Sequence, residues 1–247
     1  MNHPRILGIG TANPPVRLTQ EQSFHAAGYQ DERIRKIFLN SDIEYRHFYL
    51  EGSPNCRESS DQLNQRYLRG AMKTGCHAIL DCVNSAGTTV GDVDFLAVCT
   101  CTGYVCPDVG SRLIAHMDFR NNLQRASIVG LGCAGALPAM QRAVDFVRAN
   151  PGRQALMLAV EICSACYYVD NALEMVVGNA ICVDGAAAFL LAAGTQANRS
   201  YPQIIDFETF IDTERIEEDG LQHRDGKLRI VLGASTKRSA PVVSPSS

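Results

Sequence analysis

One cysteine of this chain stands in a setting typical of a nucleophile. Residues 128–136 read Ile-Val-Gly-Leu-Gly-Cys-Ala-Gly-Ala, an apolar run broken by glycines with Cys133 near its centre. The pattern predicts a buried strand over residues 126–129, a glycine turn, and a helix from Ala134 to about residue 149. The amide N–H groups and the positive dipole end of that helix face the sulfur, which favours the nucleophilic thiolate. Cys133 is therefore our candidate nucleophile.

The chain has ten cysteines, and most of them lie in apolar segments. We expect these to be reduced and to act as small hydrophobic side chains. Two groups also allow a zinc or redox interpretation, namely Cys99 and Cys101 with Cys106, and Cys163 with Cys166. Neither group has a nearby histidine or a second Cys-x-x-Cys at zinc-finger spacing. The spacing therefore favours pocket or core packing, and we predict no metal.

The composition is that of an ordinary globular protein. The 247 residues are 46% hydrophobic and 20% charged, with a net charge of −3. No basic stripe is present, so nucleic acid is not an expected partner. No apolar run reaches the roughly 18 residues that span a bilayer, and the first residues lack a signal-peptide pattern. We therefore expect a cytoplasmic protein that does not enter a membrane.

Strands and helices alternate along the chain, which indicates a layered α/β domain. The expected strands cover residues 5–9, 95–100, 126–129, 155–161 and 186–193, and the expected helices cover 21–41 with a break near Gly28, 61–84, 110–117 and 134–149. Residues 204–210 and 228–232 are predicted to pair as strands around a turn at 224–227. Residues 240–247 have a turn-type composition without periodicity, typical of a disordered tail.

Five motifs, in order, resemble the type III polyketide synthases of the chalcone and stilbene synthase group, which belong to the thiolase superfamily. They are Gly-Thr-Ala-Asn-Pro-Pro at 10–15, Cys-Thr-Cys-Thr-Gly at 99–103 followed by Cys106 and Pro107, Gly-Cys-Ala-Gly at 132–135, Val-Glu-Ile at 160–162 and Val-Asp-Gly-Ala-Ala-Ala at 183–188. The resemblance implies a thiolase-like fold with α/β/α layers. It places an N-terminal domain at residues 1–194, the start of a second half at 195–236 and a disordered tail at 237–247.

The resemblance also implies an acyltransferase reaction. Cys133 takes the acyl group of a starter acyl-CoA as a thioester, and the carbanion formed by decarboxylation of malonyl-CoA attacks that thioester. Such enzymes use CoA thioesters directly, so we expect no cofactor. The expected partners are acyl-CoA and malonyl-CoA. They act as homodimers. Cys106 before Pro107 matches a loop that reaches into the partner subunit and contains a cis peptide bond.

Cationic positions of the family that hold the CoA phosphates fall on Arg33 and Lys36. A third such position falls on Asn40, so one charge is lost. The alternative for Arg33 and Lys36 is that they are solvated charges on a surface helix.

Pocket-lining positions of the family fall on four cysteines, Cys101, Cys163, Cys166 and Cys182. Cys182 stands where plant members have a gatekeeper phenylalanine. A smaller side chain there widens the pocket, which favours a fatty or bulky acyl starter. For Cys163 and Cys166, ordinary core packing remains an equal alternative.

The family's other two catalytic groups are a histidine and an asparagine of the second half, and we expect this chain to lack them. The histidine that follows Cys133 is His223, which matches no family motif. Two alternatives to the synthase therefore stay open. One is a truncated, inactive homologue that binds acyl-CoA or pairs with an intact synthase. The other is a cysteine hydrolase in which His223 lies beside Cys133.

Overall fold

The computed structural model describes residues 3–51, 58–166, 169–194, 201–224 and 227–233. At its centre is a mixed sheet with the strand order β1-β7-β6-β4-β5. These strands are β1 (Arg5–Ala12), β4 (Phe95–Thr100), β5 (Gln124–Val129), β6 (Gln154–Ile162) and β7 (Asp184–Ala192). β4 is parallel to β5 and β6, whereas β7 is antiparallel to β6 and β1. The carboxyl ends of β4, β5 and β6 therefore meet at one edge, where open α/β sheets bind ligands.

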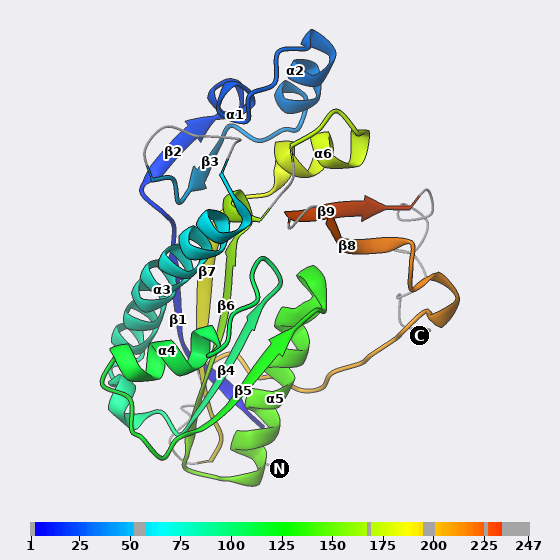
Figure 1. Ribbon diagram of the computed structural model, residues 1–247. Coiled ribbons are helices and arrows are strands. Elements are labelled where there is room, and N and C mark those ends of the chain that lie inside the picture. The colour runs from blue at the N-terminus through cyan, green and yellow to red at the C-terminus, as the bar shows by residue number, and fades with distance from the viewer. Residues whose placement is uncertain (1–2, 52–57, 167–168, 195–200, 225–226, 234–247) are drawn as a thin grey trace.

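Helices cover both faces of this sheet (Figure 1), with α3 (Ser60–Ser85) and α4 (Val109–His116) on one face and α5 (Ala136–Ala149) on the other. All six residues of β4 are buried. Leu96 and Val98 pack in the core beneath α3, while Phe95 and Ala97 pack in the core beneath α5. Side chains alternate along a strand, so a strand covered on both faces is apolar throughout. The predicted layered α/β fold is confirmed.

α3 lies very close to β1. A Cβ atom at Gly10 would overlap the backbone of Ala78 and Cys82, so only glycine fits this position. At its start, the Ser59 hydroxyl accepts from the Gln62 N–H while the Gln62 side chain accepts from the Ser59 N–H. This reciprocal cap fixes the first turn of α3.

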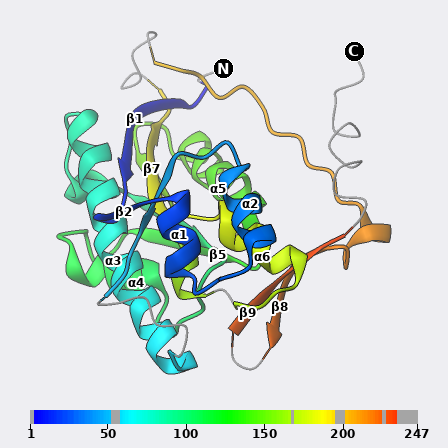
Figure 2. The ribbon, with the colours of Figure 1, turned by 90° about the horizontal axis from the view of Figure 1, so that it is seen from above.

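A smaller group of elements lies beyond the edge at which β6 ends (Figures 1 and 2). It comprises β2 (Val16–Thr19), α1 (Gln20–Ala26), α2 (Glu32–Leu39), β3 (Tyr45–Phe48) and α6 (Leu173–Ile181). Phe24, Tyr29 and Phe38 form its core together with Val176 and Ala180 of α6. α1 and α2 confirm the predicted pair of helices around Gly28. The sequence analysis predicts no strand or helix at β2, β3 or α6.

Short 3-10 turns complete the described elements: η1 (Val90–Asp92), η2 (Gly132–Gly135), η3 (Cys163–Ala165) and η4 (Thr213–Arg215). The predicted pairing of residues 204–210 with 228–232 is wrong. β9 (Lys227–Leu232) pairs with β8 (Asp219–Arg224), and near residue 204 the structure has only an isolated bridge between Arg5 and Gln203. An alternating pattern forms a strand only where a partner edge is available.

The first strand is longer than predicted. It continues through Gly10 and Thr11 to Ala12, each paired with β7. The predicted domain limits at 194 and 236 stay predictions, and the tail predicted at 237–247 lies outside the described residues. In the described part of the chain, no helix is long and apolar enough to cross a membrane.

Candidate active site

Cys133 lies on a short turn between β5 and α5. β5 ends at Val129, the 3-10 turn η2 contains Cys133, and α5 begins at Ala136. Gly130 and Gly132 have φ values of 78° and 57°, in the left-handed region that favours glycine. The Cys133 side chain is exposed. The predicted strand, glycine turn and helix are present, and the regular helix starts two residues later than expected. The strand is not buried as predicted, because β5 is the edge strand of the sheet and none of its six residues is buried.

Cys101 follows β4 at the same edge of the sheet, and its thiol is an electrostatic neighbour of Cys133. Its backbone N–H donates to the two carboxylate oxygens of Glu161, at 2.8 and 3.1 Å. Burial raises the pKa of the Cys101 thiol well above its ordinary value, and the nearby charge of Glu161 raises it further. Cys101 is therefore a neutral thiol near pH 7, next to the exposed Cys133.

Glu161 holds the loop that follows β4. Besides Cys101, it accepts hydrogen bonds from the Thr102 N–H at 3.0 Å, the Thr102 hydroxyl at 2.6 Å and the Thr100 hydroxyl at 3.3 Å. Burial raises the pKa of Glu161, while the bonds from Thr102 and Cys101 oppose that rise. A single carboxylate thus fixes the backbone on one side of the Cys133 turn.

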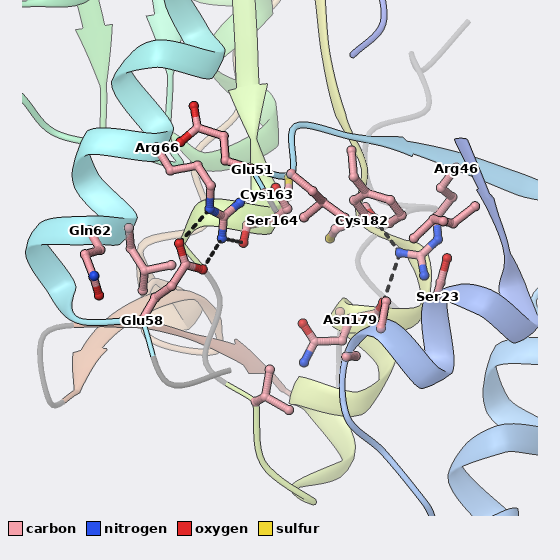
Figure 3. Close-up of a pocket in the computed structure, with 18 of the residues that line it drawn as sticks. Ser23, Arg46, Glu51, Glu58, Gln62, Arg66, Cys163, Ser164, Asn179 and Cys182 are labelled. Atoms are coloured by element: carbon pink, nitrogen blue, oxygen red, sulfur yellow. Dashed lines mark hydrogen bonds and ion pairs between the residues drawn. The ribbon is translucent and has the colours of Figure 1, made fainter. Parts of the chain in front are cut away.

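A cavity of about 530 Å³ lies between α1, β3, α3, η3 and α6 (Figure 3). That volume is in the range of small-molecule sites. Cys163 and Cys182 line it, whereas Cys101, Cys133 and Cys166 are not among its lining residues. The predicted contact of Cys163 and Cys182 with substrate stays a prediction. Apolar lining comes from Leu18, Phe48, Leu50, Leu63 and Val169, and charged lining comes from Arg46, Glu51, Glu58, Arg66 and Arg69.

Arg66 and Asp184 fix the segment that follows β6. The Arg66 guanidinium donates to the Ser164 carbonyl at 2.8 Å and pairs with Glu58 at 2.7 Å. Asp184 is fully buried and accepts from the Ser164 N–H at 2.8 Å and the Tyr49 N–H at 2.7 Å. Burial raises the pKa of Asp184, against the effect of these bonds. Together they hold the Cys163 side of the cavity.

Cys166 packs behind Cys163. Its thiol donates to the Cys163 carbonyl at 3.3 Å, and burial raises its pKa well above the ordinary value. Its predicted contact with substrate stays a prediction.

Arg33 and Lys36 are exposed on α2, about one turn apart, and neither lines the cavity. Asn40 caps the end of this helix. Among the described residues, neither cation has an ion-pair partner. Both charges are therefore available to pair with a phosphate. Their contact with CoA stays a prediction.

The peptide bond between Cys106 and Pro107 is cis, as predicted. Cys106 is exposed. With Tyr104 and Val129, the two residues line a second hollow of about 430 Å³ beside the edge strand β5. The reach of this loop into a partner subunit stays a prediction.

His223 is exposed in β8, opposite Leu228. Within the described residues, no hydrogen bond joins it to Cys133, and no group of three or more His, Cys, Asp or Glu side chains is placed to hold a metal ion.

Three side chains that hold the site have no role that the sequence alone indicates: Arg46, Glu161 and Asp184. In the sequence, Glu161 and Asp184 stand only as positions in motifs. A carboxylate in or beside an apolar strand could have pointed to them, because such a group must be hydrogen-bonded when it is buried. Arg46 carries no comparable signal, since its partners come from distant parts of the chain.

Comparison with known proteins agrees with this geometry. A family model described as FAE1/Type III polyketide synthase-like protein matches residues 32–207. The chain is 33% identical over 249 residues to a 3,5-dihydroxyphenylacetyl-CoA synthase of Streptomyces toyocaensis, covering 94% of this chain and 64% of that protein. A putative chalcone synthase of Bacillus subtilis (strain 168) is 26% identical, covering 92% of this chain and 67% of that protein.

The fold is also that of solved type III synthases. PKS-I from the brown alga Ectocarpus siliculosus has a TM-score of 0.88 at 22% identity, covering 96% of this chain and 69% of its own. The type III domain of Steely1 from Dictyostelium has a TM-score of 0.87 at 20% identity, covering 98% and 72%. The chain thus spans roughly two thirds of these proteins, and it belongs to the FAE1/type III polyketide synthase-like family, with the thiolase-like fold.

Proposed function

We propose that this protein is an acyltransferase of the type III polyketide synthase type, with Cys133 as the residue that carries the acyl group. The observation that carries the proposal is the exposed Cys133 on its glycine turn, at the start of α5. Among the cysteines of this edge, Cys99 and Cys101 are held as neutral thiols by burial. Cys133 combines access to a substrate with a helix N-terminus.

In the first step, the Cys133 thiolate attacks the carbonyl carbon of an acyl-CoA. A new S–C bond forms, the bond from that carbon to the CoA sulfur breaks, and CoA leaves as its thiolate. Backbone N–H groups at the η2 turn, including that of Cys133, are the proposed donors to the oxyanion. In the second step, malonyl-CoA loses CO₂ and its carbanion attacks the Cys133 thioester, which releases the cysteine thiolate. A thiolate suits both steps because it is a good nucleophile and a good leaving group.

The starter group occupies the cavity lined by Cys163 and Cys182 in this proposal. A cysteine at position 182 leaves more room than a large side chain, so an extended acyl group is the expected starter. Arg33 and Lys36 bind the CoA phosphates, because exposed cations without an ion-pair partner are free to pair with them. A second copy of the chain binds through the loop at Cys106 and Pro107.

A second candidate is a homologue that binds acyl-CoA, or pairs with an intact synthase, without condensation. The two candidates share the acyl-binding step and differ in chain extension.

Mass spectrometry after incubation with acetyl-, octanoyl- and dodecanoyl-CoA tests the shared step. We expect an acyl adduct on the Cys133 peptide that is lost in Cys133→Ala and retained in Cys76→Ala, which removes a half-buried thiol of α3. No adduct on Cys133 overturns the proposal that this residue carries the acyl group. Labelled malonyl-CoA is then added. A chain-extended product supports the synthase, and a thioester without extension supports the binding homologue.

A further inference from the structure

The carboxyl end of α6 places Cys182 in the cavity wall. The helix ends at Ile181, and Cys182 is its C-cap. The last carbonyl groups of a helix have no partner within the helix, so they need donors from elsewhere. Here three of them, those of Asn179, Ala180 and Cys182, accept hydrogen bonds from side chains of β3 and α1.

Arg46 of β3 supplies two of these bonds. Its Nη1 donates to the Asn179 carbonyl at 2.9 Å and to the Cys182 carbonyl at 2.6 Å (Figure 3). A cationic donor makes stronger bonds than a neutral one, and positive charge is favourable at a helix carboxyl end. Arg46 therefore holds the backbone of Cys182 directly.

Gln20, the first residue of α1, supplies the third bond and also holds Arg46. Its Nε2 donates to the Ala180 carbonyl at 2.8 Å, and its Oε1 accepts from the Arg46 Nε at 2.9 Å. Both side chains are almost fully buried, at 3% exposure for Gln20 and 4% for Arg46. Water therefore cannot replace these bonds without local opening.

Arg46 carries its positive charge in a buried environment. Burial lowers the pKa of its guanidinium to about 10, so the group is still charged at neutral pH. Its hydrogen bonds go to carbonyl oxygens and the Gln20 amide, and the groups that influence it electrostatically include Cys182, Asp184 and Cys163. A buried cation is costly unless it has hydrogen-bond partners. Among the described residues the Arg46 Nη2 has none, so the guanidinium depends on the bonds of Nε and Nη1 to Gln20 and to the α6 carbonyls.

We propose that Gln20 and Arg46 are positioning residues that fix the backbone of Cys182 and thereby set the size of the group that this end of the cavity accepts. The carbonyl of Cys182 cannot move outward unless its bond to Arg46 breaks. The identification of that group as an acyl chain rests on the proposed function. The positioning itself does not, so the two are tested separately.

Thiol labelling with reagents of two sizes tests the positioning. Iodoacetamide and fluorescein maleimide are each reacted with the full chain, and the Cys182 peptide is quantified by mass spectrometry. Gln20→Met keeps side-chain volume but removes both polar atoms, and with them the bonds to Ala180, Arg46 and Ser41. We expect the ratio of large-reagent to small-reagent labelling at Cys182 to rise at least about fivefold, which is the effect of losing one buried hydrogen bond. Arg46→Lys, which retains charge without the two-carbonyl geometry, should raise it similarly.

Ser23→Ala is the matched control. Ser23 lines the same cavity and is buried, but its hydroxyl has no hydrogen-bond partner among the described residues. The ratio should not change in this variant. A loss of stability alone would raise labelling of Cys163 and Cys82 together with Cys182, so the ratio is compared with those two thiols.

An unchanged Cys182 ratio in folded Gln20→Met and Arg46→Lys overturns the proposal. If Gln20→Met does not fold, Gln20→Glu replaces it, since the carboxylate keeps the acceptor for Arg46 and loses the donor to Ala180. If none of the three variants folds, the pair is structural and the proposal fails. Absence of an acyl adduct on Cys133 would overturn the proposed function and leave this labelling result intact.

Discussion

The Cys133 turn and the cavity wall at Cys163 and Cys182 both present cysteines, but they differ in the exposure of the thiol and in the contacts that fix the chain around it. Cys133 is exposed and follows two glycines with left-handed backbone. Cys163 is buried, and the chain around it is fixed by Arg66 and a fully buried carboxylate. The reactivity of a thiol depends on its ionisation and access. The turn therefore presents an accessible thiol, whereas the wall holds its cysteine as part of the cavity lining.

The two regions also differ in what fixes their backbone. The turn depends on conformations that glycine adopts without strain. The wall depends on side-chain bonds to the main chain, which cost free energy when one partner is removed. Substitutions should therefore affect the turn through backbone strain and chemistry, and the wall through unsatisfied buried groups.

The largest expected difference is in cysteine alkylation. Burial raises the pKa of Cys82 and of Cys99 to about 12. With brief iodoacetamide treatment near neutral pH, we expect Cys133 to label on the order of 100-fold faster than either. Peptide mass spectrometry over time measures the rates. Equal rates for Cys133 and Cys82 would remove the contrast between the two regions.

The Asp184→Ala variant should destabilise the wall strongly. It leaves the N–H groups of Tyr49 and Ser164 buried without their acceptor. We expect the free energy of unfolding to fall by about 3 kcal/mol, measured by urea denaturation. Asp145→Ala is the control, because this partly exposed aspartate pairs with Arg142 at the surface, a bond worth about 1 kcal/mol or less. Similar losses in both variants would contradict the described role of Asp184.

The Glu161→Gln variant should change stability by a smaller amount and alter its pH dependence. One oxygen acceptor is replaced by an amide donor facing Thr102 and Cys101, so we expect a loss of about 1–2 kcal/mol. Burial raises the pKa of Glu161 in the folded state, so the wild-type protein loses stability as pH rises from the ordinary glutamate pKa of 4.5 through the raised pKa of the folded state. Urea denaturation at a series of pH values should show a weaker dependence of the free energy of unfolding on pH in the variant than in the wild type. An unchanged dependence would mean that other groups produce it.

The Gly130→Ala variant should give the smallest effect. A Cβ there has no atom within 4 Å, so the cost is backbone strain alone, about 1 kcal/mol. Gly220→Ala is the control, since Gly220 of β8 is outside the left-handed region and its Cβ also has open space. Thermal unfolding compares them. A destabilisation in Gly220→Ala as large as in Gly130→Ala would show that strain at the turn is not its cause.

Much of the fold follows from local pattern. The mostly apolar segment of β4 and the glycine turn at Cys133 are visible in the sequence, because buried strands and tight turns restrict residue type. The pairing of β9 with β8 was not visible, since several segments alternate equally well. Short elements such as β2 and β3 were also missed, because four residues carry too little periodicity.

The sequence by itself determined the family and the candidate nucleophile, since both depend on short contiguous motifs such as that around Cys133. Tertiary structure alone decided which residues support the cavity. Gln20 and Arg46 meet Ala180 and Cys182 across 160 and 136 residues of chain. Buried polar groups need partners wherever the fold supplies them, and a linear sequence does not record which distant carbonyl each of them reaches.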